Sequence, residues 1–317
     1  MSSDINEKLY GKGLVYDKSP AGRCILAKRF LMPPFSVWNT KEAFWQERKR
    51  AWLRLGIKSE VGRDDALTYN IPLLLKDGRT GRKVANQTSI FDPVLTEVAY
   101  RWWCPPAGVI VDPFAGGSVR GIVASVLGYK YWGVELRDEQ VEANRGQVGP
   151  DTAGPYKPKW VQGDAAEMLA QSPPADFLFT CPPYGNLEKY SDDPKDLSSM
   201  EWGRFGEAYL GIIEKACARL RPDRFACIVV GNYRDRSKEG EGVMRDLVGG
   251  TVGCFQAAGL DLYNDIVLLN SVGSGAMRAN GSFVRGGRKV VKLHQNVLVF
   301  VKGDPRRAAA NVGILDD

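Results

Sequence analysis

The sequence has few of the residues that build metal centres and disulfide scaffolds. It contains six cysteines and one histidine in 317 residues, and no two cysteines form a CxxC pair. A structural zinc site needs four such ligands at close spacing, and disulfide scaffolds are short and rich in cysteine, so we expect neither. Unpaired cysteines at this low density indicate a reducing, cytoplasmic compartment.

Long apolar runs are also missing. Runs such as residues 225–230 and 266–269 are far below the roughly 18 residues that a membrane helix needs. The first residues, MSSDINEKLYGKG, have no apolar core, so we expect no signal peptide. Apolar residues make up 44 % and charged residues 25 % of the chain, which excludes a wholly disordered or fibrous protein. The net charge of +6 permits nucleic-acid binding without demonstrating it.

From residue 86 onward the chain alternates between helical and strand patterns. Helices are predicted over residues 93–103, 119–127, 140–145, 202–220 and 243–258. Strands are predicted over residues 108–111, 131–135, 160–162, 176–180, 225–231, 265–269 and 296–302. The alternation predicts an α/β fold with a mostly parallel seven-stranded sheet that carries helices on both faces.

The organisation predicts an N-terminal extension over residues 1–85, a main domain over 86–302 and a frayed tail over 303–317. In the extension, Asn39 and Thr40 are predicted to cap a helix over residues 41–55, in which aromatic and basic residues are interleaved. This helix either packs on the main domain or faces nucleic-acid phosphates, for which Arg48 and Lys49 are candidates. The long link over residues 270–295 is rich in Gly, Arg and Lys. Its candidates for phosphate contacts are Arg278, Arg285, Arg288 and Lys289.

A glycine-rich turn follows the first strand of the main domain. The segment VIVDPFAGGSVRG puts Asp112 at the strand end and Gly116 and Gly117 in the turn. Ligands of doubly wound sheets bind outside the carboxyl ends of the strands, and glycines there allow a ligand to approach the backbone. The dinucleotide pattern G-x-G-x-x-G is absent from this turn.

Acidic residues follow the next two strands. Glu135 ends the second strand, 23 residues after Asp112, where a carboxylate can accept hydrogen bonds from both ribose hydroxyls of an adenosine-containing ligand. Asp164 follows the third strand, within reach of the adenine edge. Each acid alone is weak evidence, but three successive strand ends with these groups predict one binding site.

The fourth strand is followed by Thr180-Cys181-Pro182-Pro183-Tyr184. The two prolines fix the backbone and remove two amide donors, so the neighbouring carbonyl groups are held as acceptors. The rigid turn also places the Tyr184 ring where it could stack on a flat substrate.

DPFAGGS and CPPY together resemble the S-adenosylmethionine-dependent DNA amino-methyltransferases, which carry DPF.G.G and [DNS]PP[YFW]. The resemblance covers residues 86–302 and implies a class I methyltransferase fold. Residues 88–95 resemble the family's third cofactor motif, with Asp92 where lysine is usual. The residues that line the cofactor pocket by this resemblance are Thr88, Phe91, Asp112, Phe114, Gly116, Gly117, Glu135 and Asp164. The block over residues 33–63 looks like a segment of phage and prophage DNA methylases.

The family mechanism implies that Cys181, Pro182, Pro183 and Tyr184 act on a base flipped out of double-stranded DNA. Cys181 departs from the family motif, in which Asp, Asn or Ser stands. It either replaces Ser, which favours cytosine N4 over adenine N6, or acts as a nucleophile for cytosine-C5 methylation, or marks a protein that binds cofactor and DNA without transfer. RNA and protein-glutamine methyltransferases with similar motifs are a further alternative.

Overall fold

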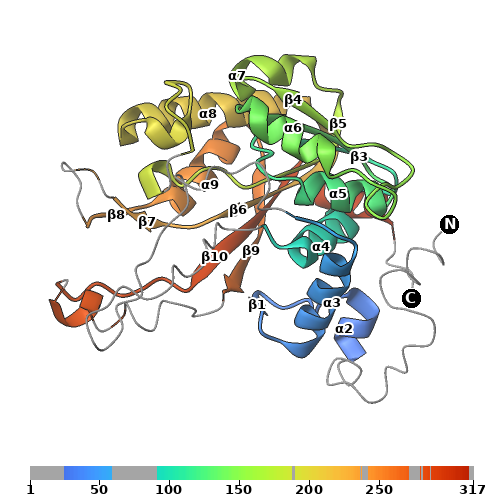
Figure 1. Cartoon of the computed structure of the whole chain (residues 1–317), viewed down its shortest axis with the longest axis horizontal. Helices are drawn as coiled ribbons and strands as arrows, with labels where there is room; N and C mark the ends of the chain where they lie inside the picture. The colour runs from blue at the N-terminus through green and yellow to red at the C-terminus, as the bar shows by residue number, and fades with distance from the viewer. Residues whose placement is uncertain are drawn as a thin grey trace.

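The computed structural model describes residues 25–58, 91–187, 190–235, 237, 242–270, 279, 281–285 and 287–313. Its centre is an eight-stranded sheet with the strand order β1-β9-β10-β6-β5-β2-β3-β4 (Figure 1). The strands are β1 (Val37–Asn39), β2 (Val109–Asp112), β3 (Lys130–Glu135), β4 (Lys159–Gln162), β5 (Ala175–Thr180), β6 (Leu220–Val230), β9 (Asp261–Leu269) and β10 (His294–Lys302). Within the described part of this sheet, only β10 runs antiparallel to its neighbours. The predicted α/β fold of the class I methyltransferase type is confirmed, with eight strands instead of seven.

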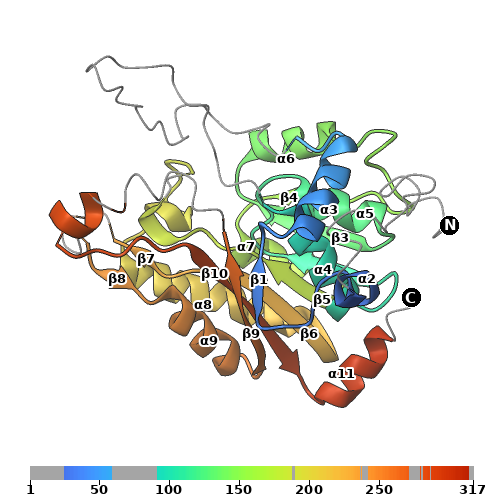
Figure 2. The same ribbon diagram turned by 90° about the horizontal axis from the view of Figure 1, so that it is seen from below.

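Helices cover both faces of the sheet (Figure 2). One face carries α3 (Ala43–Arg54), α4 (Pro93–Trp103), α5 (Val119–Val126) and α6 (Asp138–Gly146). The other carries α7 (Ala165–Met168), α8 (Trp202–Arg219) and α9 (Leu247–Ala257). Successive strand residues point to opposite faces, so Ile110 packs under the first set of helices and Val111 under the second. A short hairpin of β7 (Tyr233–Arg234) and β8 (Met244–Arg245) extends from one end.

The eighth strand comes from the N-terminal extension. Strand β1 pairs in parallel with β9, Val37 opposite Val267, and is too short to show an alternating pattern in the sequence. The predicted capping is wrong: Asn39 lies in β1, and the Thr40 hydroxyl donates to the Leu269 carbonyl at 2.9 Å. Helix α3 begins only at Ala43 and ends at Arg54.

The N-terminal residues share the core of the main domain. The indoles of Trp38, Trp45 and Trp52 are buried in the same apolar cluster as α4 and α5. Helix α2 (Ile25–Phe30) precedes them, and the Phe30 carbonyl accepts a hydrogen bond from the Trp102 indole at 2.8 Å. Residues 25–58 therefore form part of the same packed body as the sheet.

The C-terminal tail contradicts the prediction that it is frayed. Residues Pro305–Val312 form helix α11, and the Asp304 carboxylate caps its first turn through the amides of Arg306 and Arg307. Ala308 is fully buried against the sheet. The cap and the buried face hold this helix on the domain. No helix among the described residues is long and apolar enough to cross a bilayer.

The strand order positions the ligand-binding edge. From β2 the chain proceeds outward through β3 and β4, and from β5 it proceeds the other way to β6. The loops that follow β2 and β5 therefore diverge at one point of the sheet, which is where ligands of doubly wound sheets bind.

Candidate cofactor and substrate site

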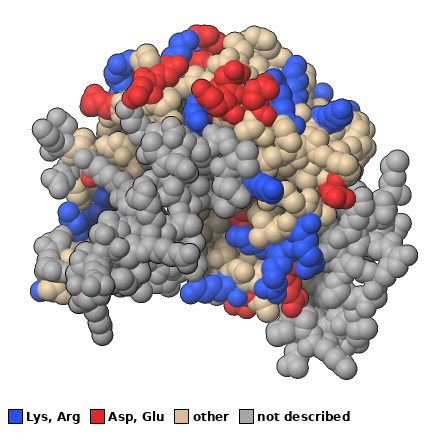
Figure 3. Space-filling view, viewed as in Figure 1, with Lys and Arg blue, Asp and Glu red and all other residues tan. Residues whose placement is uncertain are grey.

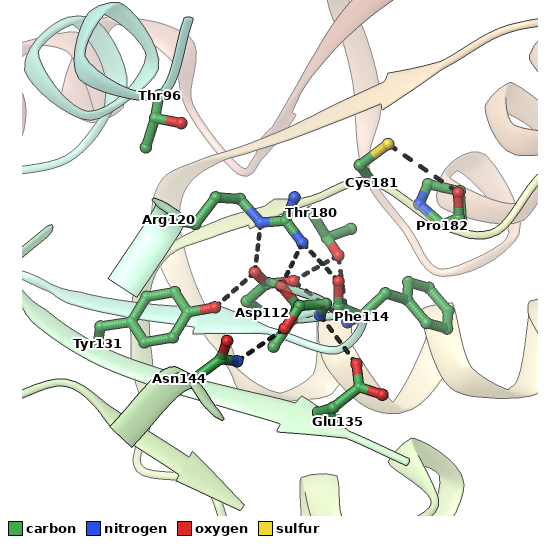
Figure 4. A network of polar contacts seen from close by, with 12 residues as sticks. Thr96, Asp112, Phe114, Arg120, Tyr131, Glu135, Asn144, Thr180, Cys181 and Pro182 are labelled. Atoms are coloured by element: carbon green, nitrogen blue, oxygen red, sulfur yellow. Dashed lines mark hydrogen bonds and ion pairs between the residues drawn. The ribbon is translucent and has the colours of Figure 1, made fainter. Parts of the chain in front are cut away.

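A buried network supports the glycine-rich turn from below (Figure 4). Asp112 Oδ1 accepts from the Phe114 amide at 3.1 Å and the Thr180 hydroxyl at 2.6 Å. Its Oδ2 accepts from Arg120 Nε at 2.6 Å and from the Tyr131 hydroxyl at 2.7 Å. The prediction that Asp112 lines the cofactor pocket is corrected, because this carboxylate is fully buried and joins the ends of β2 and β5 beneath the cavity described below.

Arg120 extends this network to the backbone of the turn. Its Nη2 donates to the carbonyl oxygens of Phe114 at 2.5 Å and Ala115 at 2.9 Å, and its guanidinium lies 4.5 Å from the Phe91 ring centre. Burial alone would lower the pKa of Arg120, but the Asp112 carboxylate, together with the neighbouring Tyr131 and Cys181, raises it. The guanidinium thus stays charged and fixes the loop that follows β2.

Glu135 ends β3 beside the glycines. Its Oε2 accepts from the Gly116 amide and its Oε1 from the Arg137 amide, each at 3.0 Å. Burial raises the pKa of Glu135, and the hydrogen bonds from these amides oppose the rise. Each oxygen keeps a second lone pair, so the carboxylate can still accept hydrogen bonds from a ligand.

A cavity lies above this network, outside the ends of the parallel strands. The predicted residues that line it are Phe91, Phe114, Gly116, Gly117, Glu135 and Asp164. Gly116 adopts a left-handed φ of +52° and a Cβ there would meet nothing within 4 Å, so conformation and not space favours glycine. Thr88, the other cofactor residue expected, lies outside the described residues.

Asp164 lines the cavity and also caps a helix. One carboxylate oxygen caps α7 by accepting from the Ala166 amide at 2.9 Å. Lys195 and Leu197, from the loop that follows the Pro-Pro-Tyr turn, line the same cavity, and Lys195 Nζ pairs with Glu167 of α7 at 2.8 Å. The ion pair thus joins this loop to α7 beside Asp164.

The turn Cys181-Pro182-Pro183-Tyr184 directly follows β5. Cys181 Sγ lies 3.9 Å from both the Pro182 carbonyl oxygen and the Tyr184 hydroxyl. Gln295 Nε2 donates to the same hydroxyl at 2.6 Å. Burial is the main cause that raises the pKa of Tyr184, so this phenol is neutral at physiological pH.

A second, larger cavity of about 940 Å³ lies on the other side of the turn. It shares Phe91, Cys181 and Tyr190 with the first cavity, and Tyr184 lines only the second. Among the described residues, its charged lining includes Lys49, Arg234, Lys289 and Lys292 together with Asp92 and Asp235, and His294 lines it as well. The Pro-Pro-Tyr turn thus lies between two cavities, and charged residues of both signs line each of them.

Helix α3 directs Arg48 toward the interior of the protein, whereas Arg50 and Arg54 are exposed. Arg48 makes a two-pronged ion pair with the buried Glu97, with both nitrogen–oxygen distances at 2.5 Å. Trp52 Nε1 donates to the same carboxylate at 2.8 Å. The prediction of Arg48 as a phosphate contact is therefore corrected, because its guanidinium compensates a buried carboxylate. Figure 3 shows other basic side chains gathered over the region where Figure 1 draws α3.

Lys49 lies at the second cavity and pairs with Asp92 at 2.9 Å. Asp92 also accepts from the Trp45 indole at 3.1 Å and caps α4 through the Val94 amide at 2.9 Å. An acid at this position, where the family usually has lysine, thus joins α3 to the start of α4, directly after Phe91.

The basic link is described in part. Lys289 lines the second cavity, and Arg288 is exposed with its guanidinium 5.1 Å from the Phe283 ring centre. Arg278 and the side chain of Arg285 lie outside what the structure describes.

No family model matches the chain, and no curated protein matches it. Among solved structures it is similar to TrmN from Thermus thermophilus, with a TM-score of 0.43, 15 % identity, 67 % of this chain and 49 % of that chain covered. The aligned part thus spans about half of TrmN. It is also similar to the precorrin-6y C5,15-methyltransferase of Geobacter metallireducens, with a TM-score of 0.41 and 14 % sequence identity. That comparison covers 77 % of this chain and 98 % of the other. A third similar structure is a candidate DNA modification methylase, also from Thermus thermophilus, with a TM-score of 0.32 and 19 % sequence identity. That comparison covers 44 % of this chain and 51 % of the other. Because these TM-scores are below 0.5, the similarities do not indicate a substrate for this chain.

Several residues of the site were not predicted from the sequence. They are Arg120, Tyr131 and Thr180 in the buried network, Asn144, which donates to the Gly116 carbonyl at 2.7 Å, and Gln295 on β10. Thr180 alone had a local signal, since it directly precedes Cys181 at the end of a predicted strand. The others are brought to the site by strand and helix packing.

Proposed function

We propose that this protein transfers a methyl group from S-adenosylmethionine to an exocyclic amine of a DNA base, with cytosine N4 slightly favoured over adenine N6. The observation that supports this most strongly is the position of the Pro-Pro-Tyr turn between two cavities. A transferase needs donor and acceptor in separate pockets that meet at the reacting atoms. Cys181 lines both cavities at that meeting point.

The first cavity fits the cofactor. Glu135 offers carboxylate lone pairs for the two ribose hydroxyls, as acids at this strand end do in related sheets. Phe91, Phe114 and Leu136 add apolar wall area suited to a flat adenine ring. When bound, S-adenosylmethionine supplies a methyl group on a sulfonium sulfur, and the amine nitrogen gains the carbon bond that sulfur gives up and then loses a proton to solvent.

The turn supplies the environment that such an amine needs. An exocyclic amine is a poor nucleophile because its lone pair is delocalised into the ring. Pro182 and Pro183 carry no amide hydrogen, so this part of the turn offers carbonyl acceptors to the amino group and no amide donors. Acceptors that hold the amino hydrogens concentrate electron density on nitrogen, and the Tyr184 ring offers a face for the base to stack on.

The second cavity suits a nucleic-acid substrate. Its volume of about 940 Å³ lies within the roughly 300–1,000 Å³ of ordinary ligand pockets. Lys289 and Lys292 offer positive charge on its walls for phosphate oxygens, whereas the charge of Lys49 is paired with Asp92. A base of duplex DNA would have to leave the stack to reach Tyr184.

Cys181 is assigned the place of serine in this proposal. The thiol is a weak hydrogen-bonding group, so the Pro182 carbonyl oxygen would be the main acceptor. Cys181→Ser should then retain methyl transfer, and loss of all activity in a folded Cys181→Ser protein would support a covalent role for the thiol in place of this proposal.

The substrate class is tested by transfer of labelled methyl groups. Purified protein and labelled S-adenosylmethionine are incubated separately with duplex DNA, with RNA and with a mixture of proteins, and Glu135→Ala serves as the control for cofactor-dependent transfer. We expect label in DNA only. Label in RNA or in protein would overturn the DNA assignment, and bound cofactor without transfer to any of them would indicate a non-catalytic binding protein.

A further inference from the structure

We infer that Gln295 is a positioning residue for Tyr184, and that its amide holds the tyrosine ring against the wall of the second cavity. Gln295 lies 111 positions along the chain from Tyr184, and its Nε2 donates to the tyrosine hydroxyl at 2.6 Å. The catalytic consequence of this contact rests on the proposed function, because it concerns the same turn.

The sheet holds Gln295 itself in place. The residue is the second of β10 and pairs with Leu268 of β9. From Asn296 onward β10 also pairs with β6, so the strand has a neighbour on each side. A side chain that starts from such a backbone begins from a well-fixed position.

A second amide fixes the other end of the Gln295 side chain. Asn270 Nδ2 donates to Gln295 Oε1 at 3.3 Å, and the Asn270 backbone amide donates to the Leu293 carbonyl at 2.9 Å. The Gln295 amide therefore has both its oxygen and its nitrogen engaged, and this orients its N–H toward Tyr184.

Packing holds the tyrosine ring on the same side. Gly231 follows β6, and a Cβ built there would lie 3.7 Å from both Gln295 Cγ and Tyr184 Cε2. The ring edge and the glutamine stem thus come together over a residue without a side chain. With the hydroxyl anchored at one end and the rigid proline turn at the other, the ring has one orientation at the cavity.

The test compares Gln295→Leu with Asn296→Leu. Asn296 is the next residue of the same strand, and its amide donates to Asp265 at 3.0 Å instead of to the turn. We expect Gln295→Leu to lower kcat by about 10- to 100-fold, as misplacement of a reacting group by about 1 Å does. Its affinity for S-adenosylmethionine should not change, because Gln295 does not line the first cavity. Asn296→Leu should keep kcat within about threefold, the effect of a surface change.

A double-mutant cycle separates positioning from a general structural effect. If Gln295 acts through the Tyr184 hydroxyl, adding Gln295→Leu to a Tyr184→Phe background should lower kcat little further. A full, additive loss on that background would overturn the inference. Equal kcat values for Gln295→Leu and the wild type would overturn it as well.

A readout independent of turnover keeps this test distinct from that of the proposed function. In protein labelled with carbon-13 at the tyrosine Cζ, the Tyr184 signal is identified by its loss in Tyr184→Phe. We expect this signal to move in Gln295→Leu and to stay in place in Asn296→Leu. An unmoved signal in Gln295→Leu would refute the positioning role, whereas wild-type protein that methylates no DNA would refute the proposed function alone.

Discussion

Replacement of Glu135 by glutamine probes the cofactor cavity with the smallest change of shape. Both carboxylate oxygens accept backbone N–H groups, from Gly116 and Arg137 at 3.0 Å each. A glutamine amide can keep only one of these bonds, because its NH₂ would face the other N–H donor to donor. One buried donor is then left unpaired, which costs about 1–3 kcal/mol of folding stability.

The effect on cofactor affinity is larger than that of an ordinary hydrogen bond. Glu135→Gln removes the charge that would accept from the ribose hydroxyls, and hydrogen bonds to charged groups contribute about 1.5–3 kcal/mol. At about 1.4 kcal/mol per factor of ten, the dissociation constant should rise roughly 10- to 150-fold. Isothermal titration with S-adenosylmethionine measures this value.

Acidification adds a second signature to the same experiment. Burial raises the pKa of Glu135 above its ordinary value of 4.5. Only the ionised carboxylate accepts from both hydroxyls, so wild-type affinity should fall as the pH drops through this raised pKa. The stability of the cofactor-free protein should change in the opposite direction. Because the pKa of Glu135 is higher in the folded than in the unfolded state, folding becomes more favourable as the pH falls and Glu135 takes up its proton. Glu135→Gln should lose the affinity change in this pH window.

The matched control for Glu135 is Glu139→Gln, since the Glu139 side chain is 77 % exposed. Stability in this variant should stay within about 0.5 kcal/mol of the wild type, and its affinity should be unchanged. Wild-type affinity in Glu135→Gln, in a protein that binds S-adenosylmethionine, would refute the assignment of Glu135 to the ribose.

Other predictions concern the buried ion pair, the network below the turn and the basic link. Arg48→Met should lower the free energy of unfolding by about 1.5–3 kcal/mol, because the charged hydrogen bonds of Arg48 to the buried Glu97 disappear while Arg101 stays 3.1 Å from the same carboxylate; urea denaturation measures this, and a stable variant with a reduced salt dependence of DNA binding would contradict it. Thr180→Val should cost about 1–3 kcal/mol in the same assay because its hydroxyl bonds to the network disappear, and a loss below about 0.5 kcal/mol would show that the network does not support the turn. Charge reversal at Arg285 and Arg288 should weaken DNA binding at low salt and reduce the slope of log affinity against log salt by about 0.9 for each phosphate that is no longer neutralised; unchanged binding would exclude a role of these two residues at phosphates.

Local patterns in the sequence were sufficient for most of the main domain. Helix α4 begins and ends at the predicted residues, Pro93 and Trp103, because Asp92 caps it and prolines follow it. The predicted strands lie within one to five residues of the observed bounds, since buried strands give short apolar runs between turns. Residues such as Glu135 were predicted to lie at the cavity because strand ends of one parallel sheet share an edge.

Long-range packing determines what the sequence left open. The role of Arg48 depends on Glu97 in another helix, and a basic residue on an amphipathic helix looks the same whether it faces phosphate or a buried acid. The position of Asp112 below the cavity depends on Thr180 from β5 and Arg120 from α5. Gln295 comes from β10, and only strand pairing brings it to the Pro-Pro-Tyr turn.

The most direct test of the proposed methyl transfer is nucleoside mass spectrometry of DNA incubated with purified protein and S-adenosylmethionine. The digest is compared with that from protein carrying Glu135→Ala, which should lose the ribose contact. A new N4-methylcytosine or N6-methyladenine peak that depends on Glu135 is the predicted result. A 5-methylcytosine peak would instead assign Cys181 as a carbon nucleophile, and no methylated nucleoside from protein that binds the cofactor would contradict transfer to DNA.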